Sequence, residues 1–186
     1  VPGTEAGKPA PKVTFGIQPI IGGTEAEARR KHRELIALVP IEHSLRRLAG
    51  RLGVAPELLD LDRPIPQNLP LPNNGNGGHT FFKGILARSQ AHGFTLREFL
   101  GEFAAGGGHR EIVGTPEQVA DDIERWFRAG AADGFNLMPG LLPSGLQDFV
   151  EQVVPILQKR GIFRTDYEGH TLRDHLGLAR PAFPPH

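Results

Sequence analysis

The residue types best suited to chemistry stand together at His109 and Arg110, directly after the glycine run Gly106–Gly108. A glycine-rich turn lets the backbone approach a ligand closely. Arginine offers a planar fork of donors to a carboxylate, sulfonate or phosphate, and histidine exchanges a proton near neutral pH. The pattern predicts a polar binding or acid–base site here. The alternative is a loop whose two side chains make only local hydrogen bonds.

Other chemical patterns in the sequence are weaker. His170, Asp174 and His175 lie close together in the tail, but their spacing fits no zinc site, and no metal is expected. The charged run Arg29–Arg33 is balanced by nearby glutamates and predicts a solvated helix face. There is no GxGxxG, Walker, GxSxG or HExxH motif, and the absence of cysteine excludes disulfides and thiol nucleophiles.

Composition narrows the possible partners. The 186 residues carry 21 Lys+Arg and 21 Asp+Glu, so the formal net charge is zero. A chain with no net charge has no positive electrostatic potential overall that would attract nucleic acid or an acidic membrane surface. No run of about 18 apolar residues could span a membrane. We therefore expect neither nucleic acid nor a membrane as a partner, and a cytoplasmic location is the default.

The elements that must position any site begin with a strand. Lys12–Ile21 is β-branched and continuously apolar, which is typical of a strand buried on both faces. Gly22 and Gly23 break this strand. Thr24 and the glutamates after it have capping-box spacing, which predicts a helix that runs to about Val39.

Helical patterns then alternate with glycine and proline breaks. Ile41–Leu52 has an apolar stripe on one face and predicts a helix. Arg63–Gly78 is too rich in Pro, Asn and Gly for regular structure, and such a long loop is typical of a lid or a disordered connection. Helices are expected over His79–His92 and again from Thr95, followed by a short extended link at His109–Val113.

The last third of the chain has the clearest helix signal. Thr115 is followed by Pro, Glu and Gln, which predicts a capped helix as far as Gly130. Gly134–Pro139 predicts a short buried strand. Ser144 and Gln147 are expected to cap the next helix, over Ser144–Gly161, which is kinked or restarted at Pro155.

This reading contains many helices and only two confident strands. Both strands are apolar throughout and join helices in a βα pattern, which is typical of a parallel sheet covered on both faces. Two parallel strands do not make a stable sheet by themselves. Either the protein is mostly helical, or further strands are missing from this chain.

Several longer stretches resemble a known family. GTPEQVAD, GFNLMP and RTDYEG in the last part of the chain, with GIQPIIGGTEAEARRKHREL upstream, resemble the C-terminal portion of flavin-dependent monooxygenases of the nitrilotriacetate and dibenzothiophene-sulfone monooxygenase group. This group lies within the bacterial-luciferase-like superfamily. The resemblance covers nearly the whole chain.

The resemblance implies an α/β fold, namely the C-terminal part of a (β/α)8 TIM barrel with a mainly helical insertion. Six strands would precede Val1, which explains the strand deficit. In the implied map, residues 1–11 are a linker or truncation point, 12–180 are the barrel part, and 181–186 are a tail. Within the barrel part, strand 7 spans 12–21, and a helix with the insertion spans 24–108, including a lid-like loop at 63–78. A helix at 115–130, strand 8 at 134–139 and a closing helix at 144–161 follow.

The resemblance also implies a reaction. Reduced FMN, supplied by a partner NAD(P)H-dependent flavin reductase, reacts with O2 and oxygenates a small organic substrate at a C–N or C–S bond. The fragment alone is expected to be inactive, because the residues that hold the FMN phosphate lie in earlier strands. A homo-oligomer is the family expectation, and the substrate is not readable.

Site residues follow from this map, since barrel enzymes place their sites at the C-terminal ends of strands. We expect His109 as the catalytic residue and the cofactor against Ile20, Met138 and Arg110. Pro19, His79 and Asn76 would contact the substrate or belong to the lid. For Ile20 and Met138 the alternative is simple core packing.

Two other functions are compatible with the sequence. One is a luciferase-like oxidoreductase that uses a deazaflavin, which the tail motifs disfavour. The other is a non-catalytic helical interaction module that binds a partner through unpaired strand edges.

Overall fold

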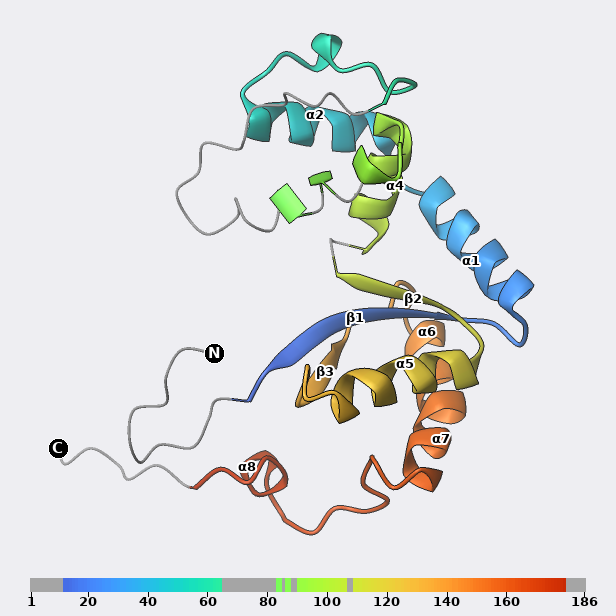
Figure 1. Ribbon diagram of the computed structural model, residues 1–186, viewed down its shortest axis with the longest axis vertical. Coiled ribbons are helices and arrows are strands. Elements are labelled where there is room, and N and C mark those ends of the chain that lie inside the picture. The colour runs from blue at the N-terminus through green and yellow to red at the C-terminus, as the bar shows by residue number, and fades with distance from the viewer. Residues whose placement is uncertain (1–11, 65–82, 85, 88–89, 107–108, 180–186) are drawn as a thin grey trace, which may run out of the picture.

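A parallel sheet lies at the centre of the protein (Figure 1). The computed structural model describes residues 12–64, 83–84, 86–87, 90–106 and 109–179. In that part of the chain β1 (Thr14–Ile21) is the middle strand, flanked by β2 (Arg110–Gly114) and β3 (Gly134–Leu137). The C-terminal half of β1 pairs with β2, and its N-terminal half pairs with β3.

Strand β2 corrects the sequence-based expectation for residues 109–113. That segment was predicted as an extended link, but it forms a strand with Ile17 opposite Arg110 and Ile21 opposite Gly114. Five residues carry too little periodicity to identify a strand. The described sheet therefore has three strands rather than two, and the third depends on hydrogen bonds to β1, about ninety residues earlier.

One face of the sheet is covered by the C-terminal helices. These are α5 (Pro116–Arg128), α6 (Ser144–Asp148), the π-helical turn η2 (Phe149–Val153) and α7 (Val154–Lys159). Their apolar side chains enclose a core with the strand residues that point the same way; its buried members include Ile17, Ile112, Val119, Phe149 and Val153.

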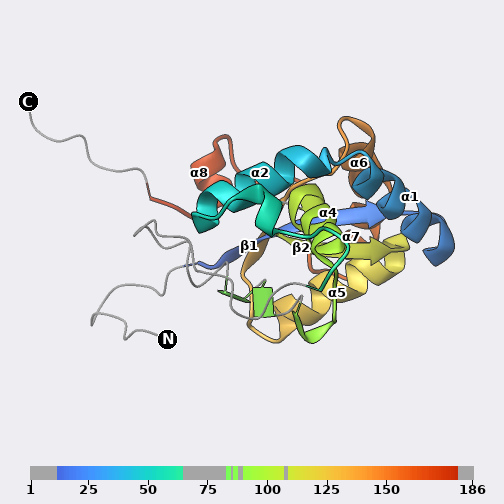
Figure 2. The ribbon, with the colours of Figure 1, turned by 90° about the horizontal axis from the view of Figure 1, so that it is seen from above.

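Helix α1 (Glu25–Ala37) lies over the opposite face of the sheet (Figure 1) and, seen from above, beside the tip of β1 (Figure 2). It connects two parts of the molecule. It contacts β1, β2 and α4 (Leu96–Gly106). Where α1 and α4 cross, a β-carbon on Gly101 would come within 2.8 Å of Ile36 Cγ2, so this glycine permits the close approach.

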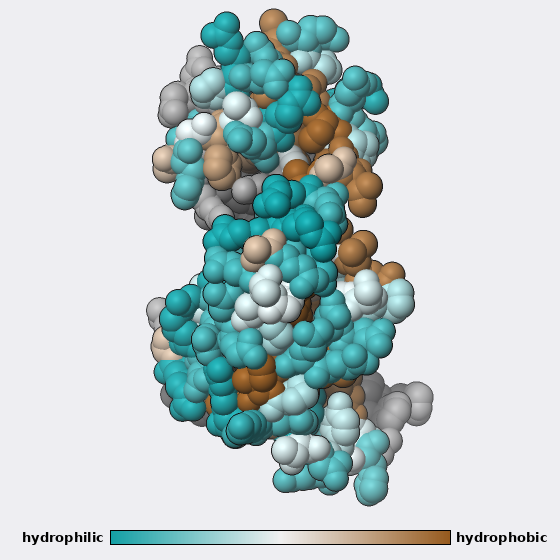
Figure 3. Space-filling view, turned by 90° about the vertical axis from the view of Figure 1, so that its right-hand side faces the viewer, coloured by the Kyte–Doolittle hydropathy of each residue, from teal (hydrophilic) through white to brown (hydrophobic). Residues whose placement is uncertain are grey.

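The remaining helices form a separate lobe. Helix α2 (Ile41–Leu52), the 3₁₀ turn η1 (Pro56–Leu58) and α4 enclose their own core, which includes Leu48, Leu52, Leu96, Phe99 and Leu100. Figure 3 shows this helical lobe above the sheet, with a narrower waist between the two. Among the described residues, the two apolar cores share no buried side chain.

Helix starts follow the sequence signals in most places. Thr24 Oγ1 accepts from the Glu27 backbone N–H, and Thr115 forms a reciprocal capping box with Gln118, both as predicted. The predicted cap at Ser144 is wrong, because α6 starts after Pro143 and has no side-chain cap. The predicted break at Pro155 coincides with the change from η2 to α7, since proline offers no N–H for a helical hydrogen bond.

The last described helix is α8 (Leu172–His175), which is short and is capped by Thr171. None of the helices in the described ranges is long and apolar enough to cross a membrane.

Candidate functional site

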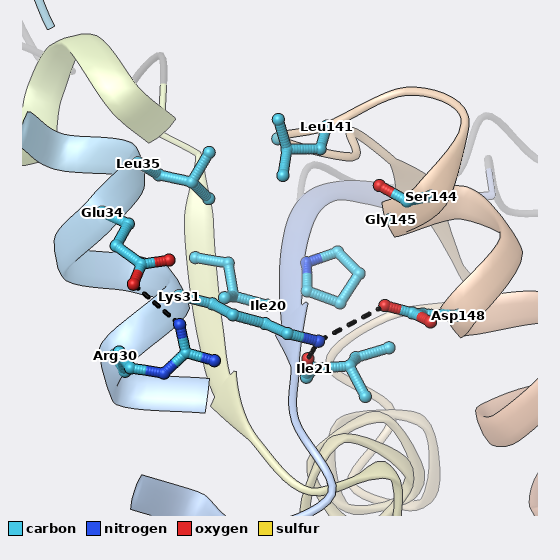
Figure 4. A pocket seen from close by; sticks show the side chains of 12 residues that line it. Ile20, Ile21, Arg30, Lys31, Glu34, Leu35, Leu141, Ser144, Gly145 and Asp148 are labelled. Carbon is cyan, nitrogen blue, oxygen red and sulfur yellow. Dashed lines mark hydrogen bonds and ion pairs between the residues drawn. The ribbon is translucent and has the colours of Figure 1, made fainter. Parts of the chain in front are cut away.

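A pocket of about 350 Å³ lies at the C-terminal end of β1, between α1 and the start of α6 (Figure 4). Its apolar lining comes from the end of the strand, from α1 and from the loop that follows β3. The lining side chains and backbone belong to Pro19, Ile20, Ile21, Arg30, Lys31, Glu34, Leu35, Gly140, Leu141, Ser144, Gly145 and Asp148.

The sharp return of the chain after β1 brings α1 over this end of the sheet. A β-carbon on Gly22 would overlap the backbone of Ala28, so only glycine fits where the chain doubles back. The Gly23 backbone N–H donates to Glu27 Oε2 at 2.9 Å. This hydrogen bond, together with Lys31 nearby, holds the pKa of the Glu27 carboxyl below its usual value.

The ammonium group of Lys31 lies between the two walls of the pocket. Its Nζ donates to the Ile21 carbonyl oxygen at 2.9 Å and lies 3.5 Å from Glu27 Oε1 and 3.7 Å from Asp148 Oδ2. Figure 4 shows the side chain reaching from α1 towards α6. One lysine therefore connects the end of β1, the first turns of α1 and the end of α6.

His109 lies on the sheet face that α1 partly covers. Alternation along β2 places His109 and Glu111 on that face with Gly16 and Gln18 of β1. The imidazole of His109 occupies the space that a side chain at Gly16 would need. His109 itself is exposed, whereas Gln18 is 4% exposed.

A buried pair of titratable residues occupies the same face. His32 Nε2 of α1 lies 2.9 Å from Glu111 Oε2, and both side chains are more than four-fifths buried. The other carboxylate oxygen, Glu111 Oε1, is buried without a hydrogen-bond partner among the described residues.

Arg110 points to the opposite face from His109, although the two are adjacent in sequence. Its Nη2 donates to Asp122 Oδ1 at 2.8 Å, and its guanidinium lies over the Trp126 ring. Trp126 in turn meets Phe15 edge-on. The structure thus separates a pair that the sequence suggested would act together.

The remaining predicted site residues divide into three groups. Pro19 and Ile20 line the pocket. Met138 is 40% exposed, and its backbone N–H donates to the Ile17 carbonyl oxygen at 2.9 Å. His79 and Asn76, with positions 65–78 of the predicted lid-like loop, lie outside the described residues.

Sequence reasoning missed four polar residues of this region, namely Lys31, His32, Glu111 and Asp148. The expectation of a solvated face at Arg29–Arg33 holds for Arg29 and Arg30, which pair with exposed glutamates. It is wrong for Lys31, which is partly buried, and for His32, which is largely buried. The identity of β2 as a strand was the signal that could have found Glu111 and, through it, His32. In the described part of the chain, no cluster of three or more His, Asp or Glu side chains could hold a metal ion.

Comparison with known proteins yields clear relatives. Nitrilotriacetate monooxygenase component A of Aminobacter aminovorans is 43% identical over 171 residues, which is 91% of this chain. N-acetyl-S-(2-succino)cysteine monooxygenase of Bacillus subtilis is 42% identical over 95% of the chain, and dibenzothiophene-sulfone monooxygenase of Rhodococcus erythropolis is 38% identical over 91%. The chain spans 37%, 40% and 38% of the length of these relatives. No family model matches.

Solved structures of similar sequence also superpose on this chain. The crystal structure of DmoA from Hyphomicrobium sulfonivorans superposes with a TM-score of 0.67 at 30% identity, covering 87% of this chain and 33% of that one. A riboflavin lyase solved with modified FMN and riboflavin superposes with a TM-score of 0.64 at 28% identity, covering 89% of this chain and 35% of the lyase.

Proposed function

Because the chain belongs to the nitrilotriacetate and dibenzothiophene-sulfone monooxygenase group of luciferase-like proteins, we propose that it forms part of a two-component FMN-dependent monooxygenase. It corresponds to the C-terminal part of such an enzyme. The observation that carries the proposal is the pocket at the C-terminal end of β1, where barrel enzymes build their sites.

The residues of this pocket fit one part of FMN. Pro19, Ile20 and Leu141 provide an apolar surface of the kind that a flat isoalloxazine ring packs against. When bound, reduced FMN supplies the oxygen-activating chemistry. The contribution of this chain is to orient the ring and to exclude water from one side of it.

His109 is our candidate for moving a proton in this reaction. It lies level with Gly16, four residues before Ile20, and this corresponds to roughly 13 Å along the strand. His109 therefore lies outside the pocket, and Gln18, which lies between them on the same face of the sheet, is 4% exposed. Arg110 lies on the opposite face, where it is engaged with Asp122 and Trp126.

The proposed partners follow from the reaction. A NAD(P)H-dependent flavin reductase would deliver reduced FMN, O2 would be the second substrate, and a small organic molecule would be oxygenated at a C–N or C–S bond. We propose a cytoplasmic location, since the reductase draws on the NAD(P)H pool. We also propose a homo-oligomer, which is what the family resemblance implies.

Oxygen consumption by the full-length enzyme tests the proposal. With a flavin reductase, NADH, FMN and a substrate, we expect substrate-dependent uptake of O2 and formation of an oxygenated product. His109→Ala should lower kcat, while the exposed His170→Ala should leave it unchanged. Activity with a deazaflavin in place of FMN, or no turnover of reduced flavin by the folded full-length protein, would contradict the proposal.

A further inference from the structure

The segment over residues 163–178, which we name the C-terminal arm, concentrates exposed apolar side chains. Fifteen large apolar residues are exposed in the described part of the chain, and five of them lie in this arm, namely Phe163, Tyr167, Leu172, Leu176 and Leu178. The arm also contains the motif RTDYEG, to which the proposed reaction gives no role. Single apolar residues are normal on a surface, but a group of this size indicates an interaction site.

The arm is locally ordered, although it packs on little of the fold. Thr171 and Asp174 form a reciprocal capping box at the start of α8. The rings of Tyr167 and His175 lie 4.4 Å apart, centroid to centroid. No other described helix or strand packs extensively against α8. A segment that is already shaped but uncovered loses little conformational entropy when it docks on a partner.

A second group of exposed apolar side chains lies at the start of the helical rod that the arm follows. This rod consists of α6, η2 and α7 and covers residues 144–159. Leu142, just before the rod, and Leu146 and Val150 within it recur at every fourth residue and are 71%, 41% and 52% exposed. Residues at this spacing on a helix lie one turn apart on the same side. We name these three residues the apolar stripe.

The arm and the stripe of one copy lie apart. Figure 1 shows α6 at one end of the rod and the arm leaving from the other end. Sixteen helical residues span roughly 24 Å, so the rod separates the two apolar groups, and both are exposed in the structure. When two such rods pair antiparallel about a two-fold axis, the end of each lies beside the start of the other.

We propose that the C-terminal arm of one copy docks on the apolar stripe of a second copy of this chain, and that the second arm does the reverse. The exchange joins eight of the fifteen exposed large apolar residues of each copy in one closed, two-fold interface. This inference rests on the proposed homo-oligomer and deepens it by naming the surfaces that meet. It uses no step of the proposed reaction.

Charged groups beside the two surfaces favour the same pairing. In the arm, Arg164 stacks on aromatic rings and Arg173 donates to a backbone carbonyl oxygen, and neither pairs with a carboxylate among the described residues. Glu151 directly follows Val150 of the stripe. Its carboxylate accepts from Gln147 Nε2 and forms no ion pair with a described cation. An arginine of the arm would therefore meet an unpaired carboxylate at the stripe.

Sedimentation velocity over a range of concentrations measures the proposed dimer. We expect a monomer–dimer equilibrium for the unchanged chain. Leu172→Asp with Leu176→Asp in the arm, and separately Val150→Asp on the stripe, should each weaken the dimer by about tenfold or more, because each places a charge in an apolar contact. The matched control is Leu38→Asp with Leu58→Asp, at positions 76% and 75% exposed outside both surfaces, and it should leave the dimer unchanged. Circular dichroism checks that every variant is folded.

Engineered disulfides identify which surfaces meet, since the chain contains no cysteine. Leu146→Cys and Leu176→Cys, made in separate chains and mixed, should give a disulfide between copies that peptide mass spectrometry identifies. Leu58→Cys mixed with Leu146→Cys is the control and should link far more slowly. With Cys at both 146 and 176 of one chain we expect a covalent dimer. A monomer linked within itself would show that the arm folds back on its own stripe, and it would overturn the inference.

A charge exchange tests the pairing at the edge of the stripe. Arg173→Glu and Glu151→Arg should each weaken the dimer by about threefold, and the double variant should recover most of that loss. A double variant weaker than either single one would overturn the proposed contact between arm and stripe.

A chain that stays monomeric at every concentration, or a dimer that the arm substitutions leave unchanged, overturns the inference. In either case the stripe has another occupant, such as a further part of a longer protein. Failure of the proposed function is a separate outcome. A full-length protein that needs the arm to dimerise but does not consume O2 with reduced FMN would retain this interface and contradict the monooxygenase assignment.

Discussion

His32 and Glu111 are 79 residues apart in sequence, yet His32 Nε2 lies 2.9 Å from Glu111 Oε2. The pair joins α1 to β2, and α1 also contacts α4 of the helical lobe. A single hydrogen bond thus helps to set how the helix between the two lobes lies on the sheet.

Removal of His32 should be more harmful than removal of both partners. His32→Leu leaves the Glu111 carboxylate buried with no partner for either oxygen among the described residues, and we expect a loss of about 2 kcal/mol in the free energy of unfolding. The double variant His32→Leu with Glu111→Leu should recover much of that loss, because it buries no unpaired charge. Urea unfolding measures both; a double variant less stable than the single one would contradict the pairing.

A side chain at Gly16 should displace His109. The β-carbon of Gly16→Ala would overlap the imidazole, so we expect altered His109 ring signals in NMR spectra and a loss of about 1 kcal/mol in stability. Gly134→Ala, in the neighbouring strand, is the control, since the contact that its β-carbon would make with the described residues is an ordinary one, to Thr14 Cγ2 at 3.4 Å. Unchanged His109 signals in Gly16→Ala would show that the ring does not rest on Gly16.

Loss of the cap at Thr115 should destabilise α5. Thr115→Ala removes the hydroxyl that accepts from the Gln118 backbone N–H and half of a reciprocal capping box. We expect a cost of about 1 kcal/mol, measured by thermal or urea unfolding. Ser144→Ala is the comparison, because α6 has no side-chain cap, and it should cost much less. Equal losses would argue against the cap.

Asp133 should make stability depend on pH in the acid range. The backbone N–H of Val13 donates to Oδ2 at 2.8 Å, and this bond, with Lys12 nearby, holds the pKa of the Asp133 carboxyl below its usual value. A group whose pKa is lower in the folded state contributes stability above its unfolded pKa and loses that contribution as the pH falls through its folded pKa.

Asp133→Asn should therefore be less stable than the unchanged chain near neutral pH, and the difference should shrink as the solution is acidified. Urea unfolding at a series of pH values from neutral to strongly acidic measures this difference. A gap that stays constant or widens in acid would contradict the assigned direction.

Local signals were sufficient for the elements with strong caps and long periodic stretches. Thr24 and Thr115 begin their helices where the sequence predicted, because capping uses side chains within three residues of the bonds they satisfy. The sequence was insufficient for β2. Its five residues become a strand only because β1 supplies the partner backbone.

The sequence by itself determined the parallel character of the sheet, the end of β1 as the position of a pocket, and the family through its motifs. Only the tertiary structure decided which side chains share that region. Strand pairing placed His109 and Arg110 on opposite faces, and the return of α1 brought Lys31 to Asp148 and His32 to Glu111. These contacts join residues far apart in the chain, and their register depends on strand pairing and packing rather than on local sequence.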